Sequence, residues 1–409
     1  MSDEVGYEPV SVKQVLAEMK DIAELLIDLS YSAVLLGSDE VAEEVLVLEE
    51  RMDVLQMQAR MSLLMAARSP EDAEALAPVL GVVGAAEKIS DAAGDIAKIV
   101  LEDIGLPDAM RAAIPEAVET LVRVTITDQS ALDGKSLGRE NIETETGVRI
   151  IALRRSGNWL LNPDHETKLE AGDVMLLRGP EDGVSRVYEQ ASGRAYVPPN
   201  PPEPGIEDLE RAVDSIVLMK NMAELAVDLA YGSVLFDSAE VAEEVVELEA
   251  EVDALQSRFE AWVLQAASRV DDPVQLRGLV HLARSTEVIS DAALEISEGV
   301  LRGLGTHPVV EQAVLESDEV IIRLTVGEGS DLDGVTLRDK MVKTETGMRV
   351  IAVHRRNKTH DARGVPDEWV VSPGPLTALH VGDVLIAKGT RTGAERLAQL
   401  AGQDSLDSL

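Results

Sequence analysis

Apolar residues in the first hundred positions of the chain recur at intervals of three and four, the spacing that places side chains on one face of a helix. The clearest run consists of Val45, Leu48, Met52, Leu55 and Ala59. Segments from Met19 to Leu29 and from Leu80 to Val100 share this spacing. The pattern therefore predicts an antiparallel bundle of long helices.

The period changes after Pro115, where apolar and polar residues alternate as they do in half-buried strands. The alternating segments read TLVRVTITD, VRIIALRR, WLLNP and DVMLLRG, and the turn signals LDG, SGN and EAGD separate them. A short helix is expected at residues 136–141. This part of the chain is predicted to form a compact α/β domain of four strands.

The whole pattern occurs twice, the second copy 200 residues after the first. YSAVLLGSDEVAEEV at Tyr31 returns as YGSVLFDSAEVAEEV at Tyr231, and TETGVRIIALRR at Thr144 returns as TETGMRVIAVHRR at Thr344. We therefore predict an α+β multidomain protein in which two helical bundles alternate with two small α/β domains, related by an internal pseudo-twofold duplication.

The copies differ at two places. The offset becomes 210 after Arg355, where a longer polar segment predicts an extended hairpin loop at residues 357–368. His354 stands where the first copy has Arg154. These differences suggest that one half has kept a function that the other half has changed.

A proline-rich segment, AYVPPNPPEPG, separates the two halves and favours a stiff, extended spacer. The predicted domains are therefore a helical bundle, an α/β domain, a linker, a second bundle and a second α/β domain, at residues 1–114, 115–192, 193–206, 207–314 and 315–403.

The composition limits the kind of partner. The chain has 409 residues, with 75 acidic residues against 37 basic ones and a formal charge of -38. This charge repels the phosphates of nucleic acids and anionic lipids, so neither is expected as a partner. The scarcity of lysine and aromatic residues resembles the cytosolic proteins of salt-loving archaea, whose surface charge is an adaptation to the solvent.

The chain lacks cysteine, which excludes disulfides and thiolate chemistry. No run of about 18 apolar residues occurs, and the first residues lack the features of a signal peptide. We expect a soluble, cytoplasmic protein without membrane insertion.

Two family resemblances cover nearly the whole chain. AEEVLVLEERMDVL (Ala42 to Leu55) and AAEKISDAAGDIAKIVL (Ala85 to Leu101) resemble the signature helices of the PhoU family. The motifs L-x-G-x-x-L, T-G-x-R-[IV]-I-A and G-D-V ahead of a final glycine occur in both α/β segments and resemble the TrkA C-terminal (RCK-C) domain. The order of the segments resembles archaeal fusions of these two families.

The resemblance implies a non-catalytic cytoplasmic regulator of K⁺ or other cation transport, such as Mg²⁺ transport. Its expected partner is an integral membrane cation transporter or channel, which would hold the protein at the inner face of the membrane, and a homodimer is compatible with it. Two alternatives stay open: a PhoU-like adaptor that regulates phosphate uptake signalling, and a metal-binding protein.

The dinucleotide-binding lobe that usually accompanies TrkA-C domains is missing. No G-x-G-x-x-G lies between a predicted strand and a long helix, and GEGSDLDG at Gly327 has the wrong spacing. We therefore expect no NAD.

Acidic residues four positions apart share one helix face and can reach one hard cation. In PhoU proteins such pairs bind metal, and both copies keep them here, which makes Mg²⁺ a candidate ligand. A solvated acidic face is the alternative, since 75 acids produce such pairs by chance. The candidate metal ligands are Glu49, Asp53, Glu87, Asp91, Asp95, Glu249, Asp253, Glu287, Asp291 and Glu295.

Paired TrkA-C domains bind cyclic di-AMP in some members of the family. The resemblance implies that the corresponding cleft would be lined by Leu137, Arg139, Asn141, Thr146, Gly147 and Arg149, with Leu337, Asp339, Met341, Thr346, Gly347 and Arg349 opposite. An arginine could hold a phosphate in bidentate fashion. Alternatively, each arginine pairs with Glu145 or Glu345.

Catalysis finds no support in the motifs. The six histidines do not recur between the copies and show no metal-ligand or triad spacing. P-loop and G-x-S-x-G motifs are also absent. We do not expect an enzyme.

Overall fold

A computed structural model describes residues 11–106, 120–128, 130–140, 142, 146–156, 158–161, 163, 166–179, 181–197, 207–304, 307–316, 320–355, 368–371 and 373–403. Most of the proline-rich linker, the inserted loop of the second copy and the candidate residue Asn141 lie outside these ranges.

Each half begins with three long helices, as the helical spacing predicts. The first half contains α1 (Val12–Leu36), α2 (Asp39–Ala66) and α3 (Pro70–Leu101), and the second contains α8 (Glu207–Phe236), α9 (Ala239–Ala267) and α10 (Arg277–Leu301). Ser38 and Ser238 cap α2 and α9 at equivalent positions. Within the described ranges, no helix combines the length and the apolar character needed to cross a membrane.

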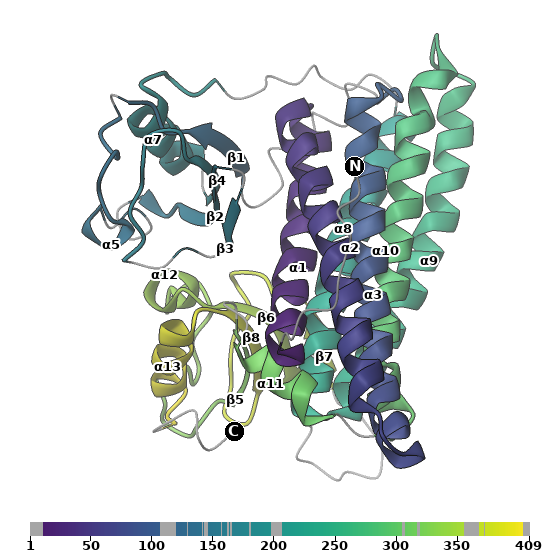
Figure 1. Ribbon diagram of the computed structural model, residues 1–409, viewed down its shortest axis with the longest axis vertical. Coiled ribbons are helices and arrows are strands. Elements are labelled where there is room, and N and C mark those ends of the chain that lie inside the picture. The colour runs from purple at the N-terminus through teal and green to yellow at the C-terminus, as the bar shows by residue number, and fades with distance from the viewer. Residues whose placement is uncertain are drawn as a thin grey trace.

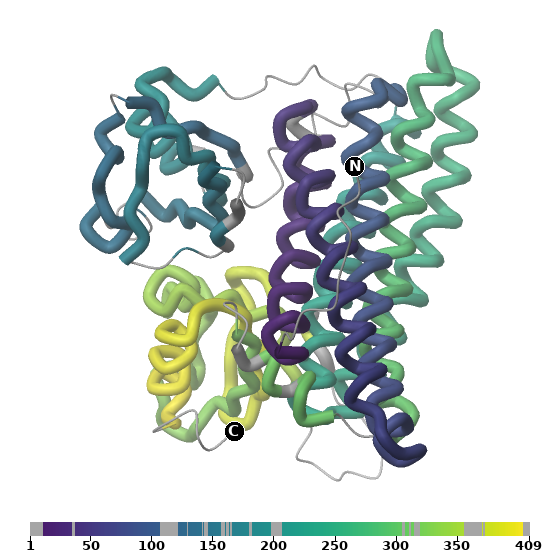
Figure 2. The backbone as a smooth tube through the Cα atoms, viewed as in Figure 1, coloured from purple at the N-terminus to yellow at the C-terminus, as the bar shows by residue number. Residues whose placement is uncertain are grey.

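The two helical units share one hydrophobic core, which includes residues from all six helices. Helices α3 and α10 pack against each other across the two halves, and Gly299 there lies close to Pro78. Figures 1 and 2 show the helices of both halves running side by side as a single elongated bundle. The duplicated unit therefore forms within one chain a pseudo-symmetric pair of bundles.

Each bundle is followed by a four-stranded antiparallel sheet. The strand orders are β1-β4-β2-β3 and β5-β8-β6-β7. The strands of the first sheet are β1 (Thr120–Thr125), β2 (Arg149–Arg155), β3 (Asn158–Leu161) and β4 (Val174–Gly179). Those of the second are β5 (Val320–Thr325), β6 (Arg349–Arg355), β7 (Glu368–Val371) and β8 (Val384–Gly389). These strands fall on the alternating segments of the sequence.

Short helices complete the two α/β domains. They are α5 (Leu137–Glu140) and α7 (Glu181–Ser192) in the first domain and α12 (Val342–Thr346) and α13 (Arg391–Leu400) in the second. Helices α7 and α13 cover one face of their sheets and were missing from the sequence-based expectation. Helix α11 (Pro308–Glu316) precedes β5, crosses the predicted boundary between residues 314 and 315, and packs on α1 of the other half.

The other face of each sheet packs on the helical bundle. In β2, the register shifts between Ile150 and Ala152, and Ile151 and Ala152 both join the core of the helices. The same shift in β6 turns Ile351 and Ala352 towards the helices. The repeated β-bulge therefore places two consecutive apolar side chains on one face in each domain. Figure 1 shows both domains on the same side of the bundle.

A close backbone approach between the halves generates a prediction about stability. Gly278, at the start of α10, donates a hydrogen bond from its amide to the carbonyl of Gly105 at 2.9 Å, and a Cβ there would overlap that carbonyl. Gly278→Ala should lower the free energy of unfolding by about 1–3 kcal/mol in urea titrations. Gly84→Ala is the control, because a Cβ at Gly84 meets no atom within 4 Å and the helix gains about 0.5–1 kcal/mol. Equal effects of the two substitutions would contradict this packing.

Candidate functional site

The acidic residues predicted as metal ligands in the first half lie on α2 and α3, and the carboxylates of the two helices lie close to one another. Burial raises the pKa of Glu49, and the negative charges of Asp91, Asp53 and Asp95 raise it further. The Glu49 carboxylate lies over Gly94, where a Cβ would overlap it, and Leu294 stands at the equivalent position of the second half. The two halves therefore present different surroundings to the equivalent carboxylates.

Nearby cations already neutralise part of this row. Lys98 contacts Glu49 at 3.8 Å and Asp95 at 3.2 Å, and Arg60 contacts Glu87 at 3.7 Å. An ion at this row would compete with Lys98 for two of its carboxylates.

The acidic residues of the second half also cluster, between α9 and α10. Burial raises the pKa of Glu287, and repulsion by Asp291, Asp253 and Glu249 adds to it. Lys88 of the other half pairs with Glu295 at the edge of this row. Across the described residues of both halves, no three or more side chains of the ligand types are arranged so that they could hold a metal ion. A metal at these rows stays a prediction.

The threonine and glycine of the T-G-x-R motif shape a turn in both α/β domains. The Thr146 hydroxyl donates to the carbonyl of Ile142 at 2.5 Å, and that of Thr346 donates to Val342 at 2.6 Å. Gly147 and Gly347 follow in the left-handed region, with φ of 71° and 73°. Leu137 and Leu337 pack partly buried against the domain cores, and Arg139, Asp339 and Met341 are exposed.

Helices α1 and α8 carry the same buried charged pattern, which the sequence analysis did not single out. Lys20, Glu24 and Asp28 of α1 correspond to Lys220, Glu224 and Asp228 of α8. Lys20 pairs with Glu24 at 2.8 Å, and Lys220 pairs with Glu224 at 2.5 Å. Lys20 and Asp228 are each only 1% exposed. Each pattern therefore places ionisable side chains inside an apolar environment, where they need partners.

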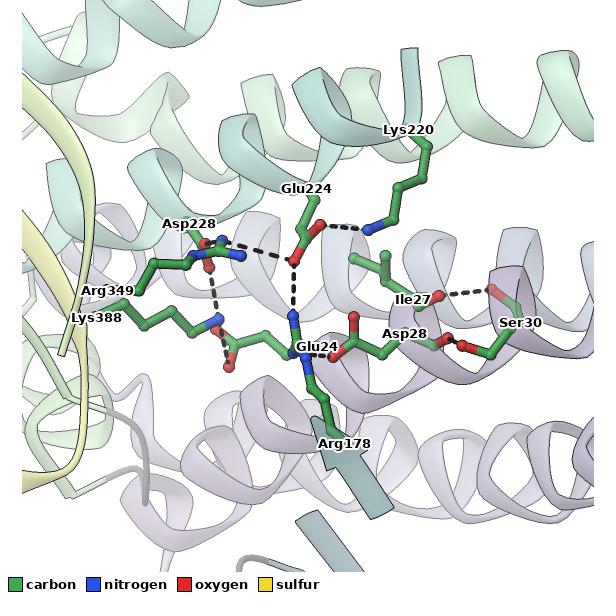
Figure 3. A network of polar contacts seen from close by, with 11 residues as sticks. Glu24, Ile27, Asp28, Ser30, Arg178, Lys220, Glu224, Asp228, Arg349 and Lys388 are labelled. Carbon is green, nitrogen blue, oxygen red and sulfur yellow. Dashed lines mark hydrogen bonds and ion pairs between the residues drawn. The ribbon is translucent and has the colours of Figure 1, made fainter. Parts of the chain in front are cut away.

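A cation from the first α/β domain reaches both helices. Arg178 of β4 contacts Asp28 of α1 at 2.6 Å and Glu224 of α8 at 3.9 Å. Figure 3 shows the Arg178 side chain entering between the two helices. This one guanidinium connects the first α/β domain to both halves of the helical bundle.

The second α/β domain repeats this connection with its own cations. Lys388 of β8, the counterpart of Arg178, contacts Asp228 at 2.7 Å and Glu24 at 3.3 Å. Arg349, directly across the sheet from Lys388, contacts Asp228 at 3.4 Å and Glu224 at 3.6 Å. Its partners thus lie on α8 and come from a distant part of the chain.

We call these charged residues of α1, α8, β4, β6 and β8 the charge network, and Figure 3 shows how all of them except Lys20 converge. Its members are Lys20, Glu24, Asp28, Lys220, Glu224, Asp228, Arg178, Arg349 and Lys388. Because all four domains contribute to it, a change in the position of one α/β domain alters the ion pairs of both bundles.

The network shifts the pKa values of its acids in opposite directions. Burial acts to raise the pKa of Glu224, but Lys220, Arg349 and Arg178 outweigh it and hold the pKa well below its usual range. For Asp28 burial prevails, and the pKa lies above its usual value despite Arg178. The ionised Glu224 is therefore stabilised by the fold, whereas the ionised Asp28 is tolerated at a cost.

Aromatic residues extend the pseudo-symmetry of the network. The ammonium of Lys20 lies 5.5 Å from the ring centre of Tyr231, and that of Lys220 lies 6.0 Å from Tyr31. The Tyr31 hydroxyl also shares a 2.5 Å hydrogen bond with Thr286 of the other half. Ala86 occupies the position equivalent to Thr286, so the first half offers Tyr231 no such hydroxyl at that position.

A large cavity of about 1380 Å³ adjoins the charge network. Its walls come from α1, α8, α9 and the second α/β domain, together with Arg178 of the first. Three predicted residues of the effector cleft line it, namely Leu337, Met341 and Arg349. Their counterparts in the first domain are absent from its described lining, so a cleft shared by the two domains stays a prediction.

The sequence did contain a signal for the charge network. The segment MKDIAELLIDLSY at Met19 returns as MKNMAELAVDLAY at Met219, with the lysine, glutamate and aspartate unchanged. Charged residues that recur at intervals of four inside an apolar run indicate buried ion pairs. Their partners on the strands could not be predicted, because they depend on how the domains pack.

Family models match most of the chain in four segments. The PhoU domain matches residues 16–100 and 216–300, and the TrkA-C domain matches residues 121–192 and 321–402. "Potassium channel protein 1" of Methanocaldococcus jannaschii is 26% identical over 88 residues, which cover 22% of this chain and 23% of that protein. The chain thus spans about a quarter of the length of this relative.

Two solved structures match much of the chain, both with low TM-scores. PhoU from Pseudomonas aeruginosa has 12% identity and a TM-score of 0.42, and the match covers 71% of this chain and 96% of that one. The GsuK RCK domain has 15% identity and a TM-score of 0.19, with 70% and 64% covered.

Removal of one partner from the charge network should be more harmful than removal of a whole ion pair. Lys388→Met leaves Asp228 and Glu24 short of a cation and should lower the free energy of unfolding by about 3–5 kcal/mol. Adding Asp228→Asn should recover part of this loss in urea titrations, because it removes a buried charge. Lys340→Met is the control, since its pair with the exposed Asp331 lies at the surface, where solvent screens it and it should contribute little.

The opposite pKa shifts predict opposite effects of pH. At neutral pH Glu224→Gln should lower the free energy of unfolding by about 3 kcal/mol. Because the folded-state pKa of Glu224 is depressed, its stabilisation is complete above the unfolded value of 4.5 and is lost as the pH falls further. The difference in the free energy of unfolding between wild type and Glu224→Gln should therefore become smaller only below about pH 4.5.

Asp28→Asn serves as the counterpart in the same titrations. The pKa of Asp28 is raised in the folded state, so its ionised form opposes folding above that pKa. Asp28→Asn should consequently cost far less at neutral pH than Glu224→Gln. Similar losses of unfolding free energy in the two variants would contradict the opposite pKa shifts of Glu224 and Asp28.

Proposed function

This chain consists of two PhoU domains that alternate with two TrkA-C domains, and from that premise we propose that it is a non-catalytic regulatory subunit of a cation transport system. The regulated protein is a membrane transporter or channel for K⁺ or another cation such as Mg²⁺. The regulator itself acts in the cytoplasm and reaches the inner face of the membrane through this partner.

The charge network is the observation that supports a regulatory role most directly. Arg178 and Lys388 each join one TrkA-C domain to both helical bundles. A ligand or partner that moves one TrkA-C domain must break or exchange these buried ion pairs. The four domains are therefore energetically coupled, as a regulator that transmits a signal between sites requires.

The mechanism we propose is a population shift between two arrangements of the domains. A ligand that binds one arrangement more tightly shifts the equilibrium towards it by its difference in affinity. The ion pairs of the charge network are suited to such a switch, because their cations have several carboxylates within reach. Arg349, for example, lies between Glu224 and Asp228.

Two effectors are proposed for this switch. Mg²⁺ at the acidic rows would meet oxygen ligands of the type it prefers, in competition with Lys98. A nucleotide such as cyclic di-AMP would bind the TrkA-C domains through arginines of the Arg349 type, in competition with Glu224 and Asp228. NAD is not part of the proposal, because the sequence has no dinucleotide-binding fingerprint.

The similarity to an archaeal protein named as a potassium channel supports the link to K⁺. The PhoU domains favour a second candidate, an adaptor that regulates phosphate uptake through a kinase or transporter. The PhoU domains cover residues 16–100 and 216–300, which form both helical bundles. A metal-binding protein is the third candidate and rests on the acidic rows alone.

Affinity purification from native membranes tests the leading proposal. An integral membrane cation transporter or channel should co-purify with the full chain, and deletion of the gene should change the intracellular content of K⁺ or Mg²⁺. The Lys388→Met variant should recover less of the partner if the charge network transmits the signal, and Lys340→Met should recover as much as the wild type.

The phosphate adaptor makes a different prediction for the same strains. Deletion would then change the output of a phosphate-starvation reporter and leave the content of both cations as it was. Recovery of no transporter, together with unchanged K⁺ and Mg²⁺, would refute regulation of cation transport.

A further inference from the structure

In the first half, a buried glutamate of the second helix forms ion pairs with the TrkA-C domain. Glu44 of α2 is 2% exposed and lies 2.6 Å from the guanidinium of Arg154 on β2. Arg123 of β1 adds a second contact at 3.5 Å. Two arginines of the sheet thus neutralise one carboxylate of the helix.

The second half keeps the glutamate but not this partner. Glu244 of α9 is only 9% exposed, and His354 replaces the arginine equivalent to Arg154. In the described part of the chain, no hydrogen bond or ion pair reaches the Glu244 carboxylate. Burial raises its pKa, and the charges that act on it, those of Glu247 and Glu251, are both negative. The carboxylate is therefore buried without a counter-ion.

Glu244 faces the 1380 Å³ cavity that adjoins the charge network. Glu247 and Glu251 line the same wall, three and seven positions further along α9. The cations of the network that reach this cavity, Arg178, Lys220 and Arg349, are already held by carboxylates of α1 and α8. The α9 wall of the cavity is consequently acidic from Glu244 to Glu251, with Arg258 two turns further along the helix, and its most buried carboxylate lacks a partner.

We propose that this cavity binds a small organic cation whose guanidinium group occupies, beside Glu244, the place that Arg154 occupies beside Glu44 in the first half. Glu247 and Glu251 attract the same positive charge. The ligand would be one molecule per chain. This inference concerns binding alone and holds whether or not the protein regulates a transporter.

The geometry favours a guanidinium over a metal ion. The three carboxylates extend over about 10 Å of helix, because seven residues rise by 1.5 Å each, so one small ion cannot contact all of them. The cavity is also far larger than a hydrated ion needs. A planar guanidinium offers parallel donors to a carboxylate and is weakly hydrated, so it can enter a partly apolar cavity more readily than an ammonium.

The walls opposite α9 limit the rest of the ligand. They carry Arg338 and Lys343 of the TrkA-C domain, so a second positive charge would be repelled there. Leu248, Leu255 and Met348 offer apolar surface between the two walls. The preferred ligand is therefore a monocation with a short apolar chain.

Butylguanidinium and its neutral isostere butylurea provide matched probes. In ligand-observed NMR titrations at fixed ionic strength, the full-length protein should bind butylguanidinium with millimolar affinity and butylurea at least tenfold more weakly. Glu244→Gln should weaken butylguanidinium binding at least tenfold. Glu44→Gln is the matched control, because Arg154 already occupies its site, and it should leave the affinity unchanged.

His354→Arg tests the same idea without removing the carboxylate. The new guanidinium should reach Glu244 as Arg154 reaches Glu44, so this variant should fold, melt at or above the wild-type temperature and lose butylguanidinium binding. Three outcomes would overturn the proposal: equal binding of the two probes, equal loss in Glu244→Gln and Glu44→Gln, or unchanged binding in a folded His354→Arg protein.

Discussion

The burial of charged residues on α1 and α8 is the constraint on which the arrangement of the domains depends. A carboxylate or ammonium taken out of water loses several kcal/mol of hydration, which only close opposite charges can offset. Neither helix carries enough cations for its own acids, since Lys20 is paired with Glu24 and Lys220 with Glu224. Asp28 and Asp228 must therefore find partners elsewhere, and the sheets supply them through Arg178 and Lys388.

Duplication within one chain makes this solution possible and also allows it to become unequal. The ion pairs that Arg178 makes in the first half are repeated by Lys388 in the second half, each cation contacting both α1 and α8. Some residues beside these ion pairs nevertheless differ between the halves. Thr286 binds Tyr31 where the other half has Ala86, and His354 replaces Arg154. Two separate chains of identical sequence could not hold such differences. The asymmetry therefore allows one half to bind a ligand at a place where the other half is closed by its own side chain.

Much of the architecture could be predicted from periodicity, because it is a local property. The spacing around Leu48 indicates a helix and the alternation around Ile150 indicates a strand, wherever these elements pack. The helices α7 (12 residues) and α13 (10 residues) were missed, although the apolar residues of each have helical spacing. The acidic residues were predicted only to share helix faces. Their meeting across two helices, and the presence of Lys98 and Arg60 among them, depend on how the helices pack.

The sequence by itself determined the duplication, the order of helical and α/β domains, and the identity of both domain families, because these rest on repeated patterns and local motifs. Only the tertiary structure decided which charges meet. Arg349 is only four positions from Glu345 in the sequence. Packing nevertheless places its guanidinium against Glu224 and Asp228, which lie more than a hundred residues away along the chain. Electrostatic partners are chosen by distance in space, and burial makes that choice strict, because an unpaired charge in the interior is costly.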